Sequence, residues 1–146
     1  MQKNIWLLSI LSAIIVILVC ILIFVPAKQR ILPTGFGGDP IITSPKYGAI
    51  ITSPLKIAGY IDNTVHGWSG FEGQVGTVKL LDSKGNELAA GVLKATTDWT
   101  KLPTQFETNL VFDTKISGPA IIIFKNKNPS GDPAKDMTLS YGVEIK

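Results

Sequence analysis

Two different hydrophobic patterns divide this chain of 146 residues. The first is continuous, because Ile5–Val25 is a run of 21 residues without a charge, nearly all of them apolar. As a helix rising about 1.5 Å per residue, this run spans about 30 Å, the thickness of the hydrocarbon core of a bilayer. The pattern therefore predicts a transmembrane anchor at residues 5–25, after a short flank at residues 1–4.

The second pattern is an alternation of apolar and polar residues after a Gly- and Pro-rich linker at residues 26–40. A period of two is typical of strands that bury one face. Pro45 and Pro54 limit the first two strands to short edge strands, whereas the continuous apolar run of the seventh favours a central strand. The expected strands are Ile41–Thr43, Ile50–Thr52, Leu55–Ile61, Gly76–Asp82, Glu87–Ala95, Phe106–Phe112, Ala120–Phe124 and Leu139–Ile145.

Seven or eight short strands separated by turn signals indicate an all-β domain at residues 41–146, large enough for a core of its own. Gly85 is expected to take a positive φ in a hairpin turn between the fourth and fifth strands. Two sheets would have to bury their apolar faces against each other, which predicts an immunoglobulin-like β-sandwich. The Cys–Trp–Cys core of many such domains is absent, so Trp99 or Trp68 is expected to fill part of that space.

Charge excludes one class of partner. The net charge of +3 comes from Lys3, Lys28 and Arg30 near the predicted anchor, since 11 lysines balance 11 acidic residues from Ile31 onward. Nucleic-acid binding needs a clustered basic face, so we expect no nucleic-acid partner.

The anchor has two alternatives. Val25 and Ala27 fit a signal-peptidase cleavage site, but the apolar region of a removable signal is shorter, about 7–15 residues. Cys20 lacks the small preceding residue of a lipid-modified cysteine and is expected to be a buried thiol within the helix. Basic residues flank both sides of the run, so the positive-inside rule does not decide its orientation.

Several short motifs resemble one bacterial family. They are Ile51-Thr52-Ser53-Pro54-Leu55 with Ile57 and Gly59, Trp68, Phe71-Glu72-Gly73, Asp82, Gly85, Trp99, Phe106 and Asn128-Pro129-Ser130-Gly131-Asp132-Pro133. In this order the motifs are similar to the immunoglobulin-like domain of bacterial spore germination, over residues 41–146. The resemblance implies an extracytoplasmic module, and hence a carboxy-terminal domain outside the cell membrane.

Catalytic chemistry has little support in the sequence. His66 is the only histidine, and neither a catalytic triad nor a histidine-based metal site has the partners it needs. Asn128, Ser130, Asp132 and Asp136 place oxygens in one loop, but this loop lacks the Gly and the bidentate Glu of a calcium hand. We therefore expect no enzyme activity, no cofactor and no metal.

A binding surface is the remaining expectation. Trp68, between Gly67 and Ser69-Gly70, is expected to lie exposed in a mobile loop with Phe71, whereas Trp99 is expected in the core. Glu72 is expected to accept backbone hydrogen bonds from a neighbouring loop and to fix its conformation. Asn128 and Asp132 are expected nearby.

The sequence thus predicts a single-pass protein of the bacterial cell membrane with a non-catalytic binding or structural module outside it. The partner would be an unknown envelope protein. The alternative is a wall glycan, either a cell-wall polysaccharide or peptidoglycan.

Overall fold

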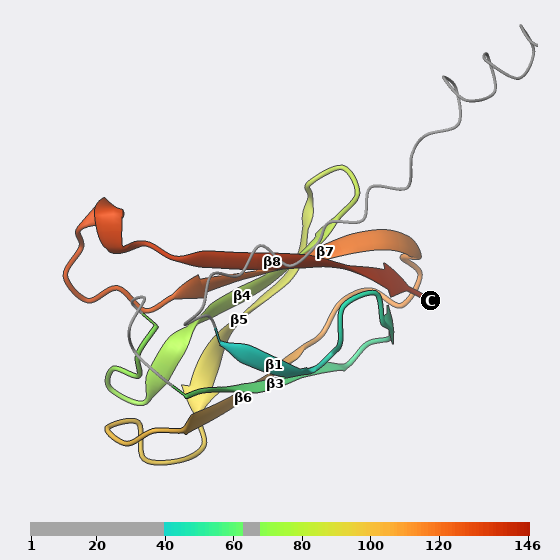
Figure 1. Cartoon of the computed structure of the whole chain (residues 1–146). Coiled ribbons are helices and arrows are strands. Elements are labelled where there is room, and N and C mark those ends of the chain that lie inside the picture. The colour runs from blue at the N-terminus through green and yellow to red at the C-terminus, as the bar shows by residue number, and fades with distance from the viewer. Residues whose placement is uncertain (1–39, 63–67) are drawn as a thin grey trace, which may run out of the picture. The chain divides into compact units, whose positions relative to one another are not determined.

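The computed structural model describes residues 40–62 and 68–146 (Figure 1). The chain divides into residues 1–30 and 31–146, and everything below concerns the second unit. The predicted anchor at residues 5–25, Cys20 and His66 lie outside the described residues. No helix within the two described ranges is long and apolar enough to cross a membrane.

The described part is all-β, as the alternation of apolar and polar residues predicts. It contains eight strands and one 3₁₀ turn, η1 (Pro133–Lys135). The strands are β1 (Ile41–Ser44), β2 (Ile50–Ile51), β3 (Leu55–Ile61), β4 (Gln74–Asp82), β5 (Glu87–Ala95), β6 (Thr104–Leu110), β7 (Gly118–Asn126) and β8 (Thr138–Ile145).

All eight strands belong to one sheet with the order β1-β3-β6-β5-β4-β7-β8-β2. The two short strands β1 and β2 are its edges, and β7 lies inside it between β4 and β8, so both predictions about strand position are confirmed. Gly85 has a φ of 85° between β4 and β5, which confirms the predicted hairpin turn.

The sheet curls at the contact between β5 and β6. These strands share only two residue pairs, Lys94 with Glu107 and Ala95 with Phe106, whereas β4 and β7 pair over seven. Figure 1 shows β1, β3 and β6 lying opposite β4, β7 and β8 as a result. The curl brings the two edges of the sheet close together. This closeness follows from the connectivity, since only a short segment joins β1 at one edge to β2 at the other.

Tyr141 of β8 fixes this closure. Its hydroxyl group donates a hydrogen bond of 2.8 Å to the carbonyl oxygen of Pro45, just after β1. Burial raises the pKa of the Tyr141 hydroxyl group, so it remains a protonated donor at neutral pH. The backbone N–H of Gly48 donates to the carbonyl oxygen of Gly142 at 2.8 Å. One side-chain and one backbone bond thus tie the first strand segment to β8.

The core lies inside the curl and is built from the inward positions of the alternating strands. Trp68, Phe106 and Phe124 are its largest fully buried side chains. Phe112 is also buried, although β6 ends at Leu110 rather than at Phe112 as predicted. The structure thus shows an eight-stranded curled sheet around one core.

Candidate functional site

Three chain segments meet at one end of the sheet, on the left in Figure 1. They are the residues that precede β4, the β5–β6 loop at residues 96–103 and the β7–β8 loop at residues 127–137. The β4–β5 hairpin and the carboxy terminus lie at the other end. We call the end of the sheet where the three segments meet the loop end. All five of the predicted binding residues belong to segments at this end.

A tight turn presents Phe71 and Glu72 at the loop end. Phe71 and Gln74 exchange two backbone hydrogen bonds, of 2.8 and 3.0 Å, across Glu72 and Gly73. Both central residues have a positive φ, 50° for Glu72 and 74° for Gly73, as a type I′ turn requires. Glu72 is the one non-glycine residue with a positive φ in the described ranges, and such strained positions concentrate at functional sites.

Glu72 acts through its backbone, which corrects the expectation for its side chain. The carboxylate is exposed and accepts no hydrogen bond from a neighbouring loop in the described part of the chain. The turn is held instead by its backbone, since the N–H of Ala95 donates to the carbonyl oxygen of Gly73 at 2.8 Å. Glu72 therefore offers a solvated negative charge beside Phe71.

The two tryptophans occupy places opposite to those predicted. Trp68 is fully buried, whereas 37% of Trp99 is exposed. A Cβ added at Gly70 would lie 2.8 Å from both the Cβ atom and the carbonyl oxygen of Trp99. Gly70 therefore permits the segment before β4 to pack closely against the β5–β6 loop, a role that does not require mobility. The predicted exposed contact at Trp68 is wrong, and Trp99 provides the accessible indole.

An Asp98-centred turn holds Trp99 at the surface. The carboxylate of Asp98 accepts hydrogen bonds from the hydroxyl group and the backbone N–H of Thr100, at 2.7 and 3.0 Å. These bonds keep the pKa of Asp98 below its ordinary value, and the bond from the Thr100 hydroxyl group makes the largest contribution. The ring of Trp99 then lies against Phe71, with ring centroids 6.2 Å apart and a tilt of 59°. The sequence signal for this arrangement is an Asp two residues before a Thr, a pattern typical of turns.

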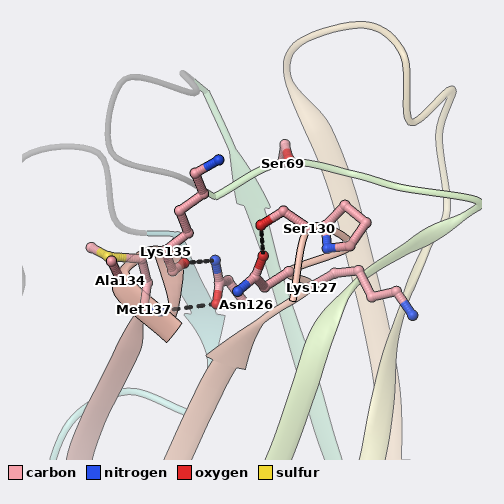
Figure 2. A pocket seen from close by; sticks show the side chains of 9 residues that line it. Ser69, Asn126, Lys127, Ser130, Ala134, Lys135 and Met137 are labelled. Atoms are coloured by element: carbon pink, nitrogen blue, oxygen red, sulfur yellow. Dashed lines mark hydrogen bonds between the residues drawn. The ribbon is translucent and has the colours of Figure 1, made fainter. Parts of the chain in front are cut away.

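Two hollows that share Ser69 open at the loop end, and Trp99 lines the smaller one. The smaller has a volume of about 370 Å³ and is lined by residues of the β5–β6 loop, including Trp99 and Leu102. The larger has a volume of about 520 Å³ and is lined mainly by the β7–β8 loop (Figure 2). Ser69 lines both, so the short segment after Trp68 separates one hollow from the other.

The β7–β8 loop uses its polar groups on itself. The side-chain amide of Asn128 donates to the carbonyl oxygen of Asp132 and to the carboxylate of Asp136, both at 2.8 Å. Ser130 donates to the amide oxygen of Asn128 at 2.7 Å, and Asp132 caps η1 by accepting from the N–H of Ala134 at 3.0 Å. Asn128 and Asp132 therefore shape the loop.

The same network bears on the calcium alternative. Oxygens that calcium would need already accept hydrogen bonds within the loop, and the carboxylate of Asp136 also forms an ion pair of 2.9 Å with Lys125. Within residues 40–62 and 68–146, no three His, Cys, Asp or Glu side chains gather as metal ligands.

Several residues at the loop end were not predicted from the sequence. Lys101, Leu102, Lys127 and Lys135 line the hollows together with Trp99, and Leu102 is 48% exposed. Only the fold shows that the β5–β6 and β7–β8 loops, about 30 residues apart in sequence, open at the same end. Comparison of the chain with protein-family models, curated proteins and solved structures finds no match.

Proposed function

We propose that this protein is a membrane-anchored, non-catalytic binding or structural module of the bacterial cell envelope, with an immunoglobulin-like domain outside the membrane. The anchor is the apolar run at residues 5–25, whose length fits a bilayer. The curled all-β sheet and the resemblance of its motifs support the assignment of the domain and a possible link to sporulation or germination.

One observation carries the binding role. Trp99 is held at the surface by the Asp98 turn, lies against Phe71 with its ring tilted, and lines a hollow. Exposed aromatic rings fixed in this way serve as anchors for a partner, because little conformational entropy is lost when they bind. Trp99 therefore takes the anchoring role that the sequence assigned to Trp68.

The alternative is binding to a wall glycan, either a cell-wall polysaccharide or peptidoglycan. It is favoured by the lining of the smaller hollow, where the exposed polar residues Thr100 and Lys101 accompany the ring of Trp99. A sugar ring presents an apolar face and several hydroxyl groups, so it suits an indole surrounded by polar side chains. A protein partner would instead use Trp99 and Leu102 as apolar anchors.

Binding to envelope material tests this proposal. The full chain in detergent is incubated with purified bacterial cell wall and, separately, cross-linked in intact membranes before affinity capture. Trp99→Ala is expected to weaken the interaction about thirtyfold, corresponding to about 2 kcal/mol for a central aromatic anchor. Tyr47→Ala is a matched control, because Tyr47 is an aromatic residue with 41% exposure outside the loop end.

The two measurements separate the candidates. Co-sedimentation with cell wall that Trp99→Ala weakens would support the glycan. Capture of a defined cross-linked protein that the same change weakens would support an envelope protein. If Trp99→Ala and Tyr47→Ala behave alike in both measurements, the loop end is not the contact surface.

A further inference from the structure

The charged residues that line the two hollows all have the same sign. Lys101 lines the smaller hollow, and Lys127 and Lys135 line the larger. Among the described residues, neither lining includes an Asp or a Glu. This is a local excess of positive charge, because the chain from Ile31 onward carries 11 lysines and 11 acidic residues.

Ion pairs elsewhere in the sheet show why the excess arises. Lys125, which does not line the hollow, forms an ion pair of 2.9 Å with Asp136, one of the two aspartates of the β7–β8 loop. No such pair is found for the ammonium groups of Lys127 and Lys135 within the described part of the chain. Lys101 has only a longer contact, 3.4 Å, with Asp98. The larger hollow is therefore lined by two lysines that form no ion pair within the described residues, and by no acidic side chain.

A buried side chain positions these lysines. Asn126, at the end of β7, is only 6% exposed. Its amide nitrogen donates to the carbonyl oxygen of Lys135, and its amide oxygen accepts from the N–H of Met137, both at 2.9 Å. Figure 2 shows the side chains of Lys135 and Lys127 extending on either side of Asn126. The wall of the hollow is thus fixed by the fold before any ligand binds.

Neutral polar groups and an aromatic ring complete the surface. Ser69, Asn128 and Ser130 add hydroxyl and amide groups to the larger hollow. The adjoining smaller hollow adds the exposed ring of Trp99. Lysines recognise carboxylate or phosphate groups, hydroxyl and amide groups recognise sugar hydroxyls, and an indole stacks on the apolar face of a sugar.

We propose that the two hollows form one site for an acidic polysaccharide, whose sugars stack on Trp99 while their carboxylate or phosphate groups contact Lys127 and Lys135. This inference rests on the proposed binding function and specifies its ligand class. The larger hollow has a volume of about 520 Å³, which lies within the range of about 300–1,000 Å³ that is usual for small-molecule sites. Three lysines are few for nucleic acid, which is held by an extended basic face.

The test measures binding of the full chain in neutral detergent to four immobilised polymers. Polygalacturonate supplies carboxylates, a glycerol-phosphate polymer supplies phosphates, dextran is the neutral polysaccharide, and double-stranded DNA is the polyanion without accessible sugar faces. We expect binding to at least one of the first two, weakened by raising the salt from about 0.05 to 0.5 M, and none to dextran or DNA. Which acidic polymer binds identifies the anionic group.

Two double variants locate the charges. Lys127→Gln with Lys135→Gln is expected to weaken binding about tenfold, since two exposed charge contacts are lost together. Lys84→Gln with Lys115→Gln is the matched control, because both lysines are exposed in turns at the other end of the sheet. The control is expected to bind as the unaltered chain does, and far-ultraviolet circular dichroism of both variants checks that the sheet is intact.

Each other result overturns the proposal. Binding to dextran as strong as to the acidic polymers removes the role of charge, and equal binding to DNA shows only nonspecific attraction. No binding to either acidic polymer, or an equal loss in both double variants, also rejects the site. If Trp99→Ala still weakens capture of an envelope protein or wall while the lysine variants change nothing, the proposed function stands and this ligand class is wrong.

Discussion

Trp68 is the largest fully buried side chain of the described residues, and its indole nitrogen has no hydrogen-bond partner among them. An unsatisfied buried donor costs about 1–3 kcal/mol, so the packing of the ring must offset this penalty. Trp68 therefore contributes apolar volume to the core, and its polar group adds nothing favourable there.

Substitutions at the tryptophans test these different roles. Trp68→Ala is expected to lower the free energy of unfolding by about 3–5 kcal/mol, because it leaves a large cavity. Trp68→Phe should cost less than half as much, since it keeps an aromatic ring and removes the unsatisfied donor. Trp99→Ala, at a residue 37% exposed, should cost about 1 kcal/mol or less.

Urea unfolding of the full chain in mild detergent, followed by far-ultraviolet circular dichroism, measures the three losses. A loss for Trp99→Ala that equals the loss for Trp68→Ala would contradict the assignment of Trp68 to the core and Trp99 to the surface.

The error in predicting these two tryptophans has a physical origin. Neighbouring glycines suggest mobility, and on that basis the sequence favoured Trp68 as the exposed ring. Gly70 instead permits the backbone of Trp99 to approach closely, a contact between segments that no local pattern reveals. The sequence therefore assigned the wrong indole to solvent, and it did not place the β5–β6 loop, which carries Trp99, at the predicted contact surface.

Strands are the elements that the sequence predicts best, because each needs only an alternation of inward and outward side chains. All eight predicted strands are present, including the short edges β1 and β2, and Gly85 forms the expected hairpin turn. Loops are different, since their meeting at one end depends on strand order and on the curl between β5 and β6. The lysines of the hollows could not be grouped without that information.

Three loops contain the same structural feature, an aspartate whose carboxylate accepts hydrogen bonds from nearby residues of the loop. Asn86 bonds to Asp82 in the β4–β5 hairpin, Thr100 bonds to Asp98, and Asn128 bonds to Asp136. In each case the side-chain hydrogen bond is the main reason that the pKa of the carboxyl group lies below its ordinary value of 3.8. The charged form of each aspartate therefore stabilises its loop.

Acid should loosen these loops first. A carboxyl group with a lowered pKa in the folded state stabilises the fold above its ordinary pKa of 3.8, and this contribution is lost as the pH falls through the folded value. We expect stability to be constant from neutral pH to about pH 5 and to fall below about pH 4. Carbon-detected NMR titration should give pKa values below 3.8 for Asp82, Asp98 and Asp136.

Asp136→Asn provides the matched variant for the acid response. It keeps an oxygen for the amide of Asn128 but removes the titrating charge. The variant should be less stable than the parent at neutral pH and lose less stability on acidification. An unchanged acid response would show that Asp136 does not contribute to it.

On the scale of the whole molecule, the described domain and the apolar run at residues 5–25 predict opposite environments. The domain carries 11 lysines and 10 acidic residues and builds its own core, whereas the run has the length and composition of a bilayer-spanning helix. A Gly- and Pro-rich linker between them would let the loop end reach partners at some distance from the membrane. The orientation matters because the proposed envelope function requires the domain to lie outside the membrane.

Protease protection tests the topology directly. With the anchor retained and the domain outside, protease added to intact spheroplasts should remove residues 41–146 and leave a small membrane fragment that an amino-terminal tag reports. Because the linker is rich in Gly and Pro and the sheet is held by many backbone pairs, cleavage should begin in the linker. A full-length protein that resists protease until lysis would reverse the orientation, and release of the domain into the medium without protease would favour the cleaved signal peptide.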